Sequence, residues 1–268
     1  MRQIGRDDTI FSSPAFLWDS VLFNLYALMR ESSSPILFSD SESAIVAQAA
    51  PGMPMWIWTA DGISAGACRE LLPAVRKSLI RFPASNITAK PAMYKLLILE
   101  RTGPQIAPQH LIAYGCDRPV LHDVLFGSFY RPCEKDVPRV AEFLAEYEAE
   151  SSAAPGSMRD LLAVAEQMIY CKELYLWKNP RGEVVSMAKI AHRGMGQARI
   201  HAVFTKPDQR NKGYAGMLVY TLCGMIRKEQ LLPMLYADAE NAAANKTYQK
   251  IGFANCGDLM ILSLSGRK

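Results

Sequence analysis

The sequence has no dense cluster of lysine and arginine, no long apolar run and no closely spaced cysteine pair. Its 30 basic and 26 acidic residues are scattered over 268 positions, without the basic stripe that follows a phosphate backbone. No segment approaches the roughly 18 consecutive apolar residues of a membrane span. These absences predict a protein that binds neither nucleic acid nor membrane.

The spacing of the cysteines excludes the common zinc motifs. The six cysteines are far apart, with no CxxC pair and no neighbouring histidine pair that could complete a metal site. We therefore expect no bound metal, and reduced thiols in a cytoplasmic protein. The first residues, MRQIGRDDTIFSS, carry acids where a secretory signal needs an apolar core, so we expect no export signal.

What the chain does have is enough apolar residues for a sizeable core. Hydrophobic residues make up 50% of the sequence and charged residues 21%, which is typical of globular proteins and unlike disordered ones. The length of 268 residues favours two domains. We expect an N-terminal domain at 1–125 and a C-terminal domain at 126–268, with a break at Ser151–Ser157 as the alternative boundary.

The first half has the pattern of an α/β domain without a functional motif. Apolar spacing predicts an amphipathic helix over Ala15–Arg30, with Leu17 and Leu28 on its apolar face. The β-prone runs SAIVAQAA, MWIWTA and YKLLILE predict strands. The segment LLPAVRKSLIRF predicts a helix between them.

The second half is more regular. Its predicted elements are a strand at FGSFYRP, helices at VPRVAEFLAEYEAE and MRDLLAVAEQMIY, strands at ELYLWKN, EVVSMAKIA and ARIHAVFT, a helix from Gly213, a strand at PMLYADA, a helix at NAAANKTYQK and a strand at DLMILSLS. Tyr147 falls on the apolar face of the first of these helices. The predicted order is strand, two helices, three strands, helix, strand, helix, strand.

The segment from Thr205 to Ile226 is a candidate phosphate site. A strand ends at Thr205, KPDQ leads to RNKGYA, and apolar residues then recur with helical spacing. A helix N-terminus offers unpaired N–H groups and the positive end of the helix dipole, so a glycine-bearing loop before it suits phosphate. Gly213 lets the backbone approach an anion, and Arg210 and Lys212 add positive charge. An ordinary strand-to-helix turn with a solvated basic rim accounts for the hexapeptide equally well.

A second candidate group lies downstream, in ADAENAAANKTYQKIGF. Asn241, Asn245 and Tyr248 are spaced i, i+4 and i+7, which places two amides and a phenol on one helical face. Taken singly, Asn241 is also a good N-cap and Tyr248 an ordinary half-buried aromatic residue. A phenol has an ordinary pKa of about 10 and a thiol about 8.5, so a tyrosine can donate a proton to a departing thiolate.

The order VFTKPDQRNKGYA, then LYADAENAAANKTYQKIGF, resembles the GNAT N-acetyltransferase superfamily. Its signature is R/Q-x-x-G-x-G/A, followed by Asn, a Tyr seven residues on and Gly-Phe; Ala215 takes the second glycine position here, and Thr205 stands where Val is more common. The resemblance extends from about Phe126 to the C-terminus. It implies an α/β fold with a mixed central sheet flanked by helices, and an enzyme that transfers an acetyl group from acetyl-CoA to a primary amine by direct attack.

The resemblance also implies roles for particular residues. Tyr248 would be the general acid, the backbone around Val203 would pair with the pantetheine arm, and the loop would wrap the diphosphate. The full implied set for coenzyme A binding is Val203, Phe204, Thr205, Arg210, Asn211, Lys212, Gly213, Tyr214, Ala215, Asn241 and Asn245. The implied acceptor is a small-molecule amine or amino acid.

The general base is less specified. His201 shares strand parity with Val203 and Thr205, so we expect it to face the same side, and it is our catalytic candidate beside Tyr248. A structural histidine is the alternative, and Glu173, Glu183, His192, Asp238 or a relaying water stay open as the base. A non-catalytic acyl-CoA-binding module is the alternative function.

The first half of the chain carries no copy of the loop motif. A degenerate N-terminal half before a complete acetyltransferase domain is similar to tandem members of the superfamily, including glycine N-acyltransferase-like proteins. Such a half would shape the acceptor pocket or a homodimer contact.

Overall fold

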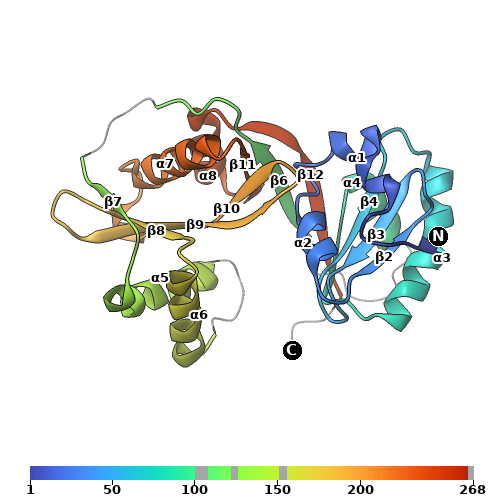
Figure 1. Cartoon of the computed structure of the whole chain (residues 1–268), viewed down its shortest axis with the longest axis horizontal. Helices are drawn as coiled ribbons and strands as arrows, with labels where there is room; N and C mark the ends of the chain where they lie inside the picture. The colour runs from blue at the N-terminus through green and yellow to red at the C-terminus, as the bar shows by residue number, and fades with distance from the viewer. Residues whose placement is uncertain (100–107, 122–125, 151–155, 265–268) are drawn as a thin grey trace. The chain divides into compact units, whose positions relative to one another are not determined.

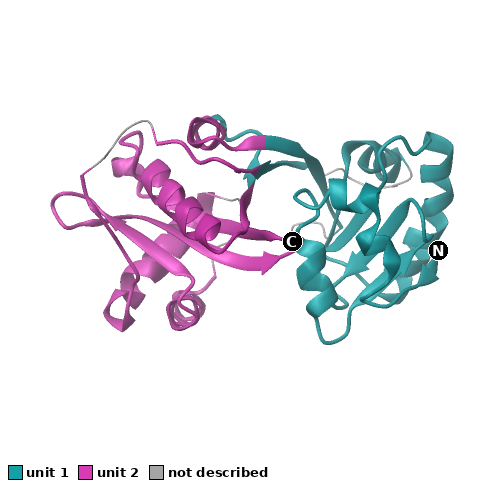
Figure 2. Cartoon of the chain, turned by 45° about the horizontal axis from the view of Figure 1, so that its top comes forward, with its two compact units in different colours: residues 1–114, 236–242, 255–268 teal, residues 115–235, 243–254 magenta. Residues whose placement is uncertain are grey.

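The computed structural model describes residues 1–99, 108–121, 126–150 and 156–264. The chain forms two compact units, drawn in separate colours in Figure 2. Unit 1 comprises 1–114, 236–242 and 255–268, and unit 2 comprises 115–235 and 243–254. The boundary expected near Leu125 and most of the alternative at 151–157 lie outside the described residues. Unit 1 takes in the last strand, which we expected in the C-terminal domain.

The first half of the chain contains six strands and four α-helices in its described residues (Figure 1). Their bounds are β1 Arg2–Gln3, α1 Pro14–Trp18, α2 Leu25–Glu31, β2 Ile36–Ser39, β3 Ala44–Gln48, β4 Met55–Thr59, α3 Ala65–Arg81, β5 Asn86–Ala89, α4 Pro91–Leu99 and β6 Gln109–Gly115.

The second half confirms the predicted element order. Its elements are β7 Ser128–Tyr130, α5 Val137–Glu150, α6 Met158–Tyr170, β8 Leu174–Lys178, β9 Val184–Gly194, β10 Gln197–Thr205, α7 Tyr214–Lys228, β11 Leu232–Asp238, α8 Ala242–Ile251 and β12 Ala254–Ser263. Helix α6 begins after the N-cap Ser157, and helix α8 ends before Gly252, as the residues at these two predicted breaks indicate.

The two halves share one order of elements and one pattern of strand directions. Each half runs strand, two helices, three strands, helix, strand, helix, strand. In the first half, β2, β3 and β4 pair antiparallel, and β4 then pairs parallel with β5. In the second half, β8, β9 and β10 pair antiparallel, and β10 then pairs parallel with β11.

In unit 2 the helices cover both faces of the sheet formed by β7 to β11. Figure 1 shows α5 and α6 on one face and α7 on the other. The α5 and α6 face is a hydrophobic cluster whose strand residues are Leu174, Leu176, Met187 and Phe204. The ring of Phe204 packs 5.5 Å from that of Phe143 on α5. The apolar stripe of the amphipathic helix α5 is therefore what fixes that face of β10.

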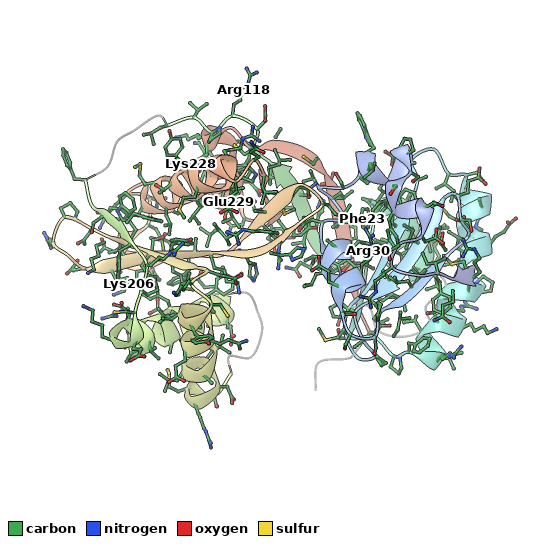
Figure 3. All side chains as sticks on the ribbon, in the orientation of Figure 1. Phe23, Arg30, Arg118, Lys206, Lys228 and Glu229 are labelled. Carbon is green, nitrogen blue, oxygen red and sulfur yellow. The ribbon has the colours of Figure 1, made fainter. Side chains whose placement is uncertain are left out.

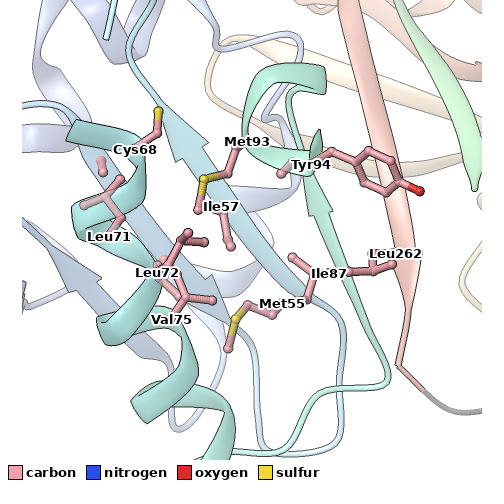
Figure 4. Packing of buried hydrophobic residues seen from close by; sticks show 13 residues of the cluster. Met55, Ile57, Cys68, Leu71, Leu72, Val75, Ile87, Met93, Tyr94 and Leu262 are labelled. Carbon is pink, nitrogen blue, oxygen red and sulfur yellow. The ribbon is translucent and has the colours of Figure 1, made fainter. Parts of the chain in front are cut away.

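In unit 1 the strand order is β1-β2-β3-β4-β5-β12-β6. Figure 4 shows α3 and α4 packing on one face of this sheet, through a cluster that includes Leu72, Met93, Ile57 and Leu262. Leu262 comes from β12, which pairs antiparallel with β5. The final strand of the chain thereby completes the hydrophobic core of unit 1.

Two predictions for the first half are wrong. YKLLILE is not a strand: through Leu99 it belongs to helix α4, because Pro91 starts a helix and packing against the core overrides β propensity. Ala15–Arg30 is not one helix but α1 and α2 with a turn between them. Leu17 and Leu28, expected on the apolar face, are 49% and 47% exposed.

The break between α1 and α2 has a physical cause in Asp19. This residue is buried, and its carboxylate accepts hydrogen bonds from Trp58 Nε1 at 2.7 Å and from Lys90 Nζ at 2.5 Å. Lys90 also contacts Asp61 at 2.6 Å. A buried carboxylate needs such partners, and Asp19 meets them from the turn that follows α1.

No described helix is both long and apolar enough to cross a bilayer.

We predict that Asp19→Ala lowers the free energy of unfolding by about 2–4 kcal/mol, because it leaves Trp58 Nε1 and Lys90 without their shared buried acceptor. Denaturant unfolding measures this loss. Asp61→Ala is the matched control: Asp61 bonds the same Lys90, but its side chain is 71% exposed, so the loss should stay under about 1 kcal/mol. Equal losses in the two variants would contradict the assignment.

Candidate functional site

The strand β10 parts from β11 after the first third of its length. Among the described residues of these strands, β10 pairs with β11 only from Gln197–Leu232 to Arg199–Met234. Its pairing with β9 continues to Thr205–Ser186, with register shifts between Arg199 and Ile200 and between His201 and Phe204. From residue 200 onward, β11 therefore no longer pairs with this edge of β10. Backbone groups on the edge are available to a ligand.

A bulge in β10 corrects the expected parity of His201. Ala202 has a φ of 51°, a left-handed conformation that is unusual for a residue with a Cβ. His201 contacts Tyr147 of α5 and Phe204 contacts Phe143 of α5, so His201 and Phe204 share a face. Thr205 therefore lies on the other face, and the expectation that His201 faces the same side as Thr205 is wrong. An inserted residue reverses strand alternation.

The loop after β10 forms the N-terminus of α7. Asn211 and Gly213 have φ values of 59° and 82°, and no side chain caps the helix. The first helical hydrogen bond runs from Met217 N–H to Gly213 O at 3.0 Å. The N–H groups of 214–216 consequently have no partner inside the helix.

Both basic side chains of the loop bond within the protein. Arg210 Nε donates to Thr205 O at 3.0 Å, and the guanidinium also pairs with Glu150, the last residue of α5. Lys212 Nζ donates to Asp208 O at 3.1 Å and to Gln209 Oε1 at 3.0 Å. In this structure the two cations hold the shape of the loop and keep positive charge beside it.

Two labelled lysines locate the loop and the helix in Figure 3. Lys206 follows β10 at the start of the loop, and Lys228 is the last residue of α7.

Helix α8 brings two of the predicted residues onto one buried face. Asn245 and Tyr248 are each 8% exposed and share that face with Ile251. Burial raises the pKa of the Tyr248 phenol above its ordinary value of 10, and the nearby Tyr147 phenol raises it further. Tyr248 is therefore protonated at neutral pH.

The Gly-Phe pair after α8 holds Tyr248 in place. Gly252 has a φ of 102°, and a Cβ there would lie 2.8 Å from Arg118 O, so only glycine fits. Phe253 N–H donates to Tyr248 O at 3.1 Å. The Phe253 ring then packs edge-on against the Tyr248 ring, with centroids 5.9 Å apart. The sharp turn at Gly252 thus folds the chain back onto the tyrosine.

Asn241 stands directly before α8, at the N-cap position. Its N–H donates to Asp238 O at 3.1 Å. Asn241 and Asp238 both belong to unit 1, whereas the loop, Asn245 and Tyr248 belong to unit 2. The unit 2 site therefore consists of β10, the loop and α8.

His201 lies at the surface beside a tyrosine and two cations. The Tyr147 ring meets the imidazole edge-on with centroids 6.4 Å apart. Surrounding protein atoms lower the pKa of His201, and Arg199 and Lys189 lower it further, to about 3. The residue as a whole is exposed, and solvent moderates the first of these effects. The imidazole is therefore neutral at pH 7.

The other candidate bases lie in different surroundings. Glu173 is 3.9 Å from Lys189 Nζ. Glu183 accepts a hydrogen bond of 2.7 Å from Asn179 in the turn between β8 and β9. His192 is buried on β9 opposite Arg199. These surroundings do not single out one residue as the general base, and the identity of the base stays a prediction. No group of three or more metal-ligating side chains occurs among the described residues.

Two residues of this region were not predicted as functional. Tyr147 has the spacing of a core residue on α5, which concealed its contact with His201. Glu150 pairs with Arg210 across 60 positions of sequence, and no local pattern indicates such a pair. Phe204, predicted among the cofactor contacts, has its side chain buried against α5, so only its backbone is available to a ligand.

Comparison with known proteins agrees with the described fold. Residues 180–259 match the family model described as FR47-like protein. A GNAT-family acetyltransferase from Colwellia psychrerythraea is 12% identical, with 98% of each chain covered and a TM-score of 0.58. The chain has the GNAT fold.

Other solved structures match to a similar degree. A GCN5-related N-acetyltransferase from Kribbella flavida is 13% identical over 95% of this chain and 98% of its own, with a TM-score of 0.59. A Drosophila protein is 10% identical over 98% of each chain, with a TM-score of 0.63. A comparison with curated proteins found no match. The predicted mixed sheet flanked by helices is confirmed.

We predict that the pKa of His201, measured by NMR titration of the imidazole, is well below the ordinary 6.5. A depressed pKa means that the unfolded chain binds the proton more readily. The contribution of His201 to stability is therefore present above pH 6.5 and declines as the pH falls below it. Arg199→Gln should raise the pKa, and a value of 6.5 or higher in the wild type would contradict the described surroundings.

Proposed function

We propose that the protein is an acetyl-CoA-dependent N-acetyltransferase acting on a primary amine. The observation that carries this proposal is that β10, after it has parted from β11, leads through a loop to the uncapped N-terminus of α7. An extended edge that leads to a row of unpaired amides suits a ligand with an amide-bearing arm and a diphosphate. Coenzyme A has both parts.

Acetyl-CoA would supply a thioester whose carbonyl carbon an amine can attack. The N–H groups of Tyr214, Ala215 and Gly216 would bind the diphosphate, and Arg210 and Lys212 would support it electrostatically. The Thr205 carbonyl already accepts from Arg210. We therefore assign the arm chiefly to the backbone around Val203, beside the bulge. Asn245 completes this set from α8, and we keep Asn241 as a further contact.

Tyr248 is the proposed general acid. Its raised pKa keeps the phenol protonated at pH 7, and it would protonate the CoA sulfur as the carbon–sulfur bond breaks. Backbone N–H groups at the parted edge of β10 would stabilise the oxyanion. These two donors act at different atoms of the thioester.

His201 is less suited to remove the proton from the amine. Arg199 and Lys189 disfavour its protonated form, so the imidazole is a weak base. We propose that neutral His201 accepts a hydrogen bond from the attacking amine, and that water carries the proton away. The neutral amine then attacks the carbonyl carbon, and its surplus N–H proton leaves to water as the carbon–sulfur bond breaks. Water returns a proton to the Tyr248 phenol, which has protonated the sulfur.

Two features favour a second candidate, a non-catalytic acyl-CoA-binding module. Tyr248 is only 8% exposed, and His201 is a weak base. Incubation with acetyl-CoA and a pool of amines separates the two functions. An enzyme releases free thiol at a rate that depends on amine concentration, whereas a binding module binds acetyl-CoA and releases none.

We further propose that the first half of the chain is a degenerate copy of the same fold. The shared element order and strand directions support this. The helix α3, which corresponds in order to α7, is capped by Ser64, whose side chain accepts from Ala67 N–H at 3.1 Å. Ser64 occupies one of the helix amides, and the carboxylate of Asp61 precedes the helix in sequence. Both features make the start of α3 poorly suited to a diphosphate. This half would serve the acceptor pocket or a homodimer contact.

We predict that Gly213→Ala weakens coenzyme A binding at least about fivefold, because a Cβ opposes the left-handed backbone at φ 82° and crowds the amides. Calorimetry measures the affinity. Gly182→Ala is the matched control, since Gly182 has a φ of 81° in the turn after β8 with open space around it. The Gly182→Ala control should lose a similar amount of folding stability and keep its affinity for coenzyme A. Equal affinity for coenzyme A in the two variants would rule out the loop before α7 as the diphosphate site.

We predict that Tyr248→Phe lowers kcat by about 10²-fold or more while the affinity for acetyl-CoA stays within about twofold. Thiol release gives the rate and calorimetry the affinity. In the wild type, any decline of rate from ionisation of Tyr248 should occur only above pH 10. Tyr170→Phe, on a side chain that is 85% exposed, is the control. Full activity in Tyr248→Phe would remove the phenol from the mechanism.

A further inference from the structure

Two cysteines that are far apart in the sequence lie together in the interior of unit 2. Cys116 directly follows β6 and Cys223 lies on α7, and both side chains are fully buried. The Cys223 thiol donates a hydrogen bond to the Cys116 sulfur. Cys116 Sγ in turn donates to Ile251 O at the end of α8, at 3.9 Å. A disulfide places its two sulfurs about 2 Å apart, so sulfurs that are already in contact have only a short distance to close.

The surroundings make Cys116 the more acidic thiol of this pair. The hydrogen bond from Cys223 lowers the pKa of Cys116, and the Arg227 guanidinium also lowers it, although burial and the Asp117 carboxylate oppose them. The same hydrogen bond raises the pKa of Cys223, as does burial. Because the thiolate is the nucleophile in thiol oxidation, Cys116 is suited to react first and Cys223 second.

Cys116 lies close to the protein surface. The side chains of the next two residues, Asp117 and Arg118, are 67% and 95% exposed. Figure 3 shows Arg118 pointing away from the protein. The Asp117 carboxylate also pairs with Arg227 of α7, at 3.2 Å. The buried sulfur is therefore one residue away from exposed chain, within reach of an oxidant as small as hydrogen peroxide.

We propose that Cys116 and Cys223 form a reversible disulfide that ties α7 to the segment after β6, with a peroxide as the oxidant. The Cys116 sulfur attacks one oxygen of hydrogen peroxide and the O–O bond breaks, which gives a sulfenic acid and one water. The Cys223 sulfur then attacks the Cys116 sulfur, the S–O bond breaks and a second water leaves. The two thiols lose two electrons and two protons, and the peroxide takes them up.

The disulfide would add a covalent bond to a region that is held by hydrogen bonds. Cys116 N–H donates to Pro233 O of β11 at 2.9 Å, and Val120 N–H donates to Ile251 O of α8 at 2.7 Å. The segment 116–120 therefore already joins β11 to α8, and the disulfide would join α7 to both. A cross-link between residues far apart in sequence restricts the unfolded chain, so unit 2 should resist unfolding more when oxidised. Neither thiol has a part in the proposed acetyl transfer.

Peroxide treatment of a variant without exposed thiols tests the pair directly. Replacing Cys133, Cys171 and Cys256 by serine leaves the three buried thiols. We expect a limited excess of hydrogen peroxide to lower the intact mass by about 2 Da, because two hydrogens are lost. Mass spectrometry of a digest should show the peptides of Cys116 and Cys223 joined, and dithiothreitol should separate them. The oxidised protein should have a Tm higher by about 5 °C or more, and reduction should restore the original value.

Two single replacements in this variant serve as controls. Cys68→Ala removes the buried thiol that packs in the core of unit 1, and it should leave the mass loss unchanged. Cys223→Ala should abolish the mass loss, and Cys116 should instead gain about 16 Da as a sulfenic acid. The joined peptides are sought with both cysteines in place, so a control that fails to fold does not hide the result.

A digest without the joined peptides would overturn the inference. So would a disulfide that includes Cys68, or oxidation of Cys116 to a sulfinic acid while Cys223 stays free. An unchanged Tm in the fully oxidised protein would contradict the tie between α7 and the segment after β6. None of these measurements uses coenzyme A, so their failure would leave the proposed function intact.

Discussion

The structure of the candidate site depends on backbone hydrogen bonds that the fold leaves unmade. β10 continues to pair with β9 after it has parted from β11, so only one of its edges loses a neighbour. The helix that comes next begins without a side-chain cap. Buried or partly buried amides and carbonyls need partners, and our proposal is that a ligand supplies them here. Gly213 and the left-handed Ala202 are the local distortions that maintain this arrangement.

The contrast between the two halves arises from the same constraint. In the first half, Ser64 caps the helix that corresponds to α7. There, Lys90 joins the carboxylates of Asp19 and Asp61, and Trp58 donates to Asp19. Side chains of the chain itself thus meet the polar groups of that region. In the second half, the equivalent helix begins without a side-chain cap, and Arg210 and Lys212 bond to backbone carbonyls in and before the loop. One order of elements can therefore serve either as support or as a binding site.

The sequence was sufficient for the elements of the second half and for its loop. Strong helical spacing defined α5, α6 and α7, and the loop motif placed Gly213 directly before α7 as expected. Local pattern failed where tertiary contacts decide. The run YKLLILE has strand-forming residues but packs as a helix, and buried Asp19 interrupts the expected first helix. The bulge at Ala202 contains no glycine that would indicate it in the sequence. The face on which His201 lies could therefore not be predicted from the alternation of side chains along the strand. The pairing of Glu150 with Arg210 is equally invisible in sequence.

The proposed function depends above all on the amides at the start of α7 receiving a diphosphate. Backbone NMR of the protein during titration with coenzyme A tests this most directly, with pantetheine, which lacks phosphate, as the comparison ligand. We expect large, saturable shifts of the Tyr214, Ala215 and Gly216 amides with coenzyme A and small ones with pantetheine. Binding of coenzyme A that leaves these three amides unshifted would contradict the proposed diphosphate site.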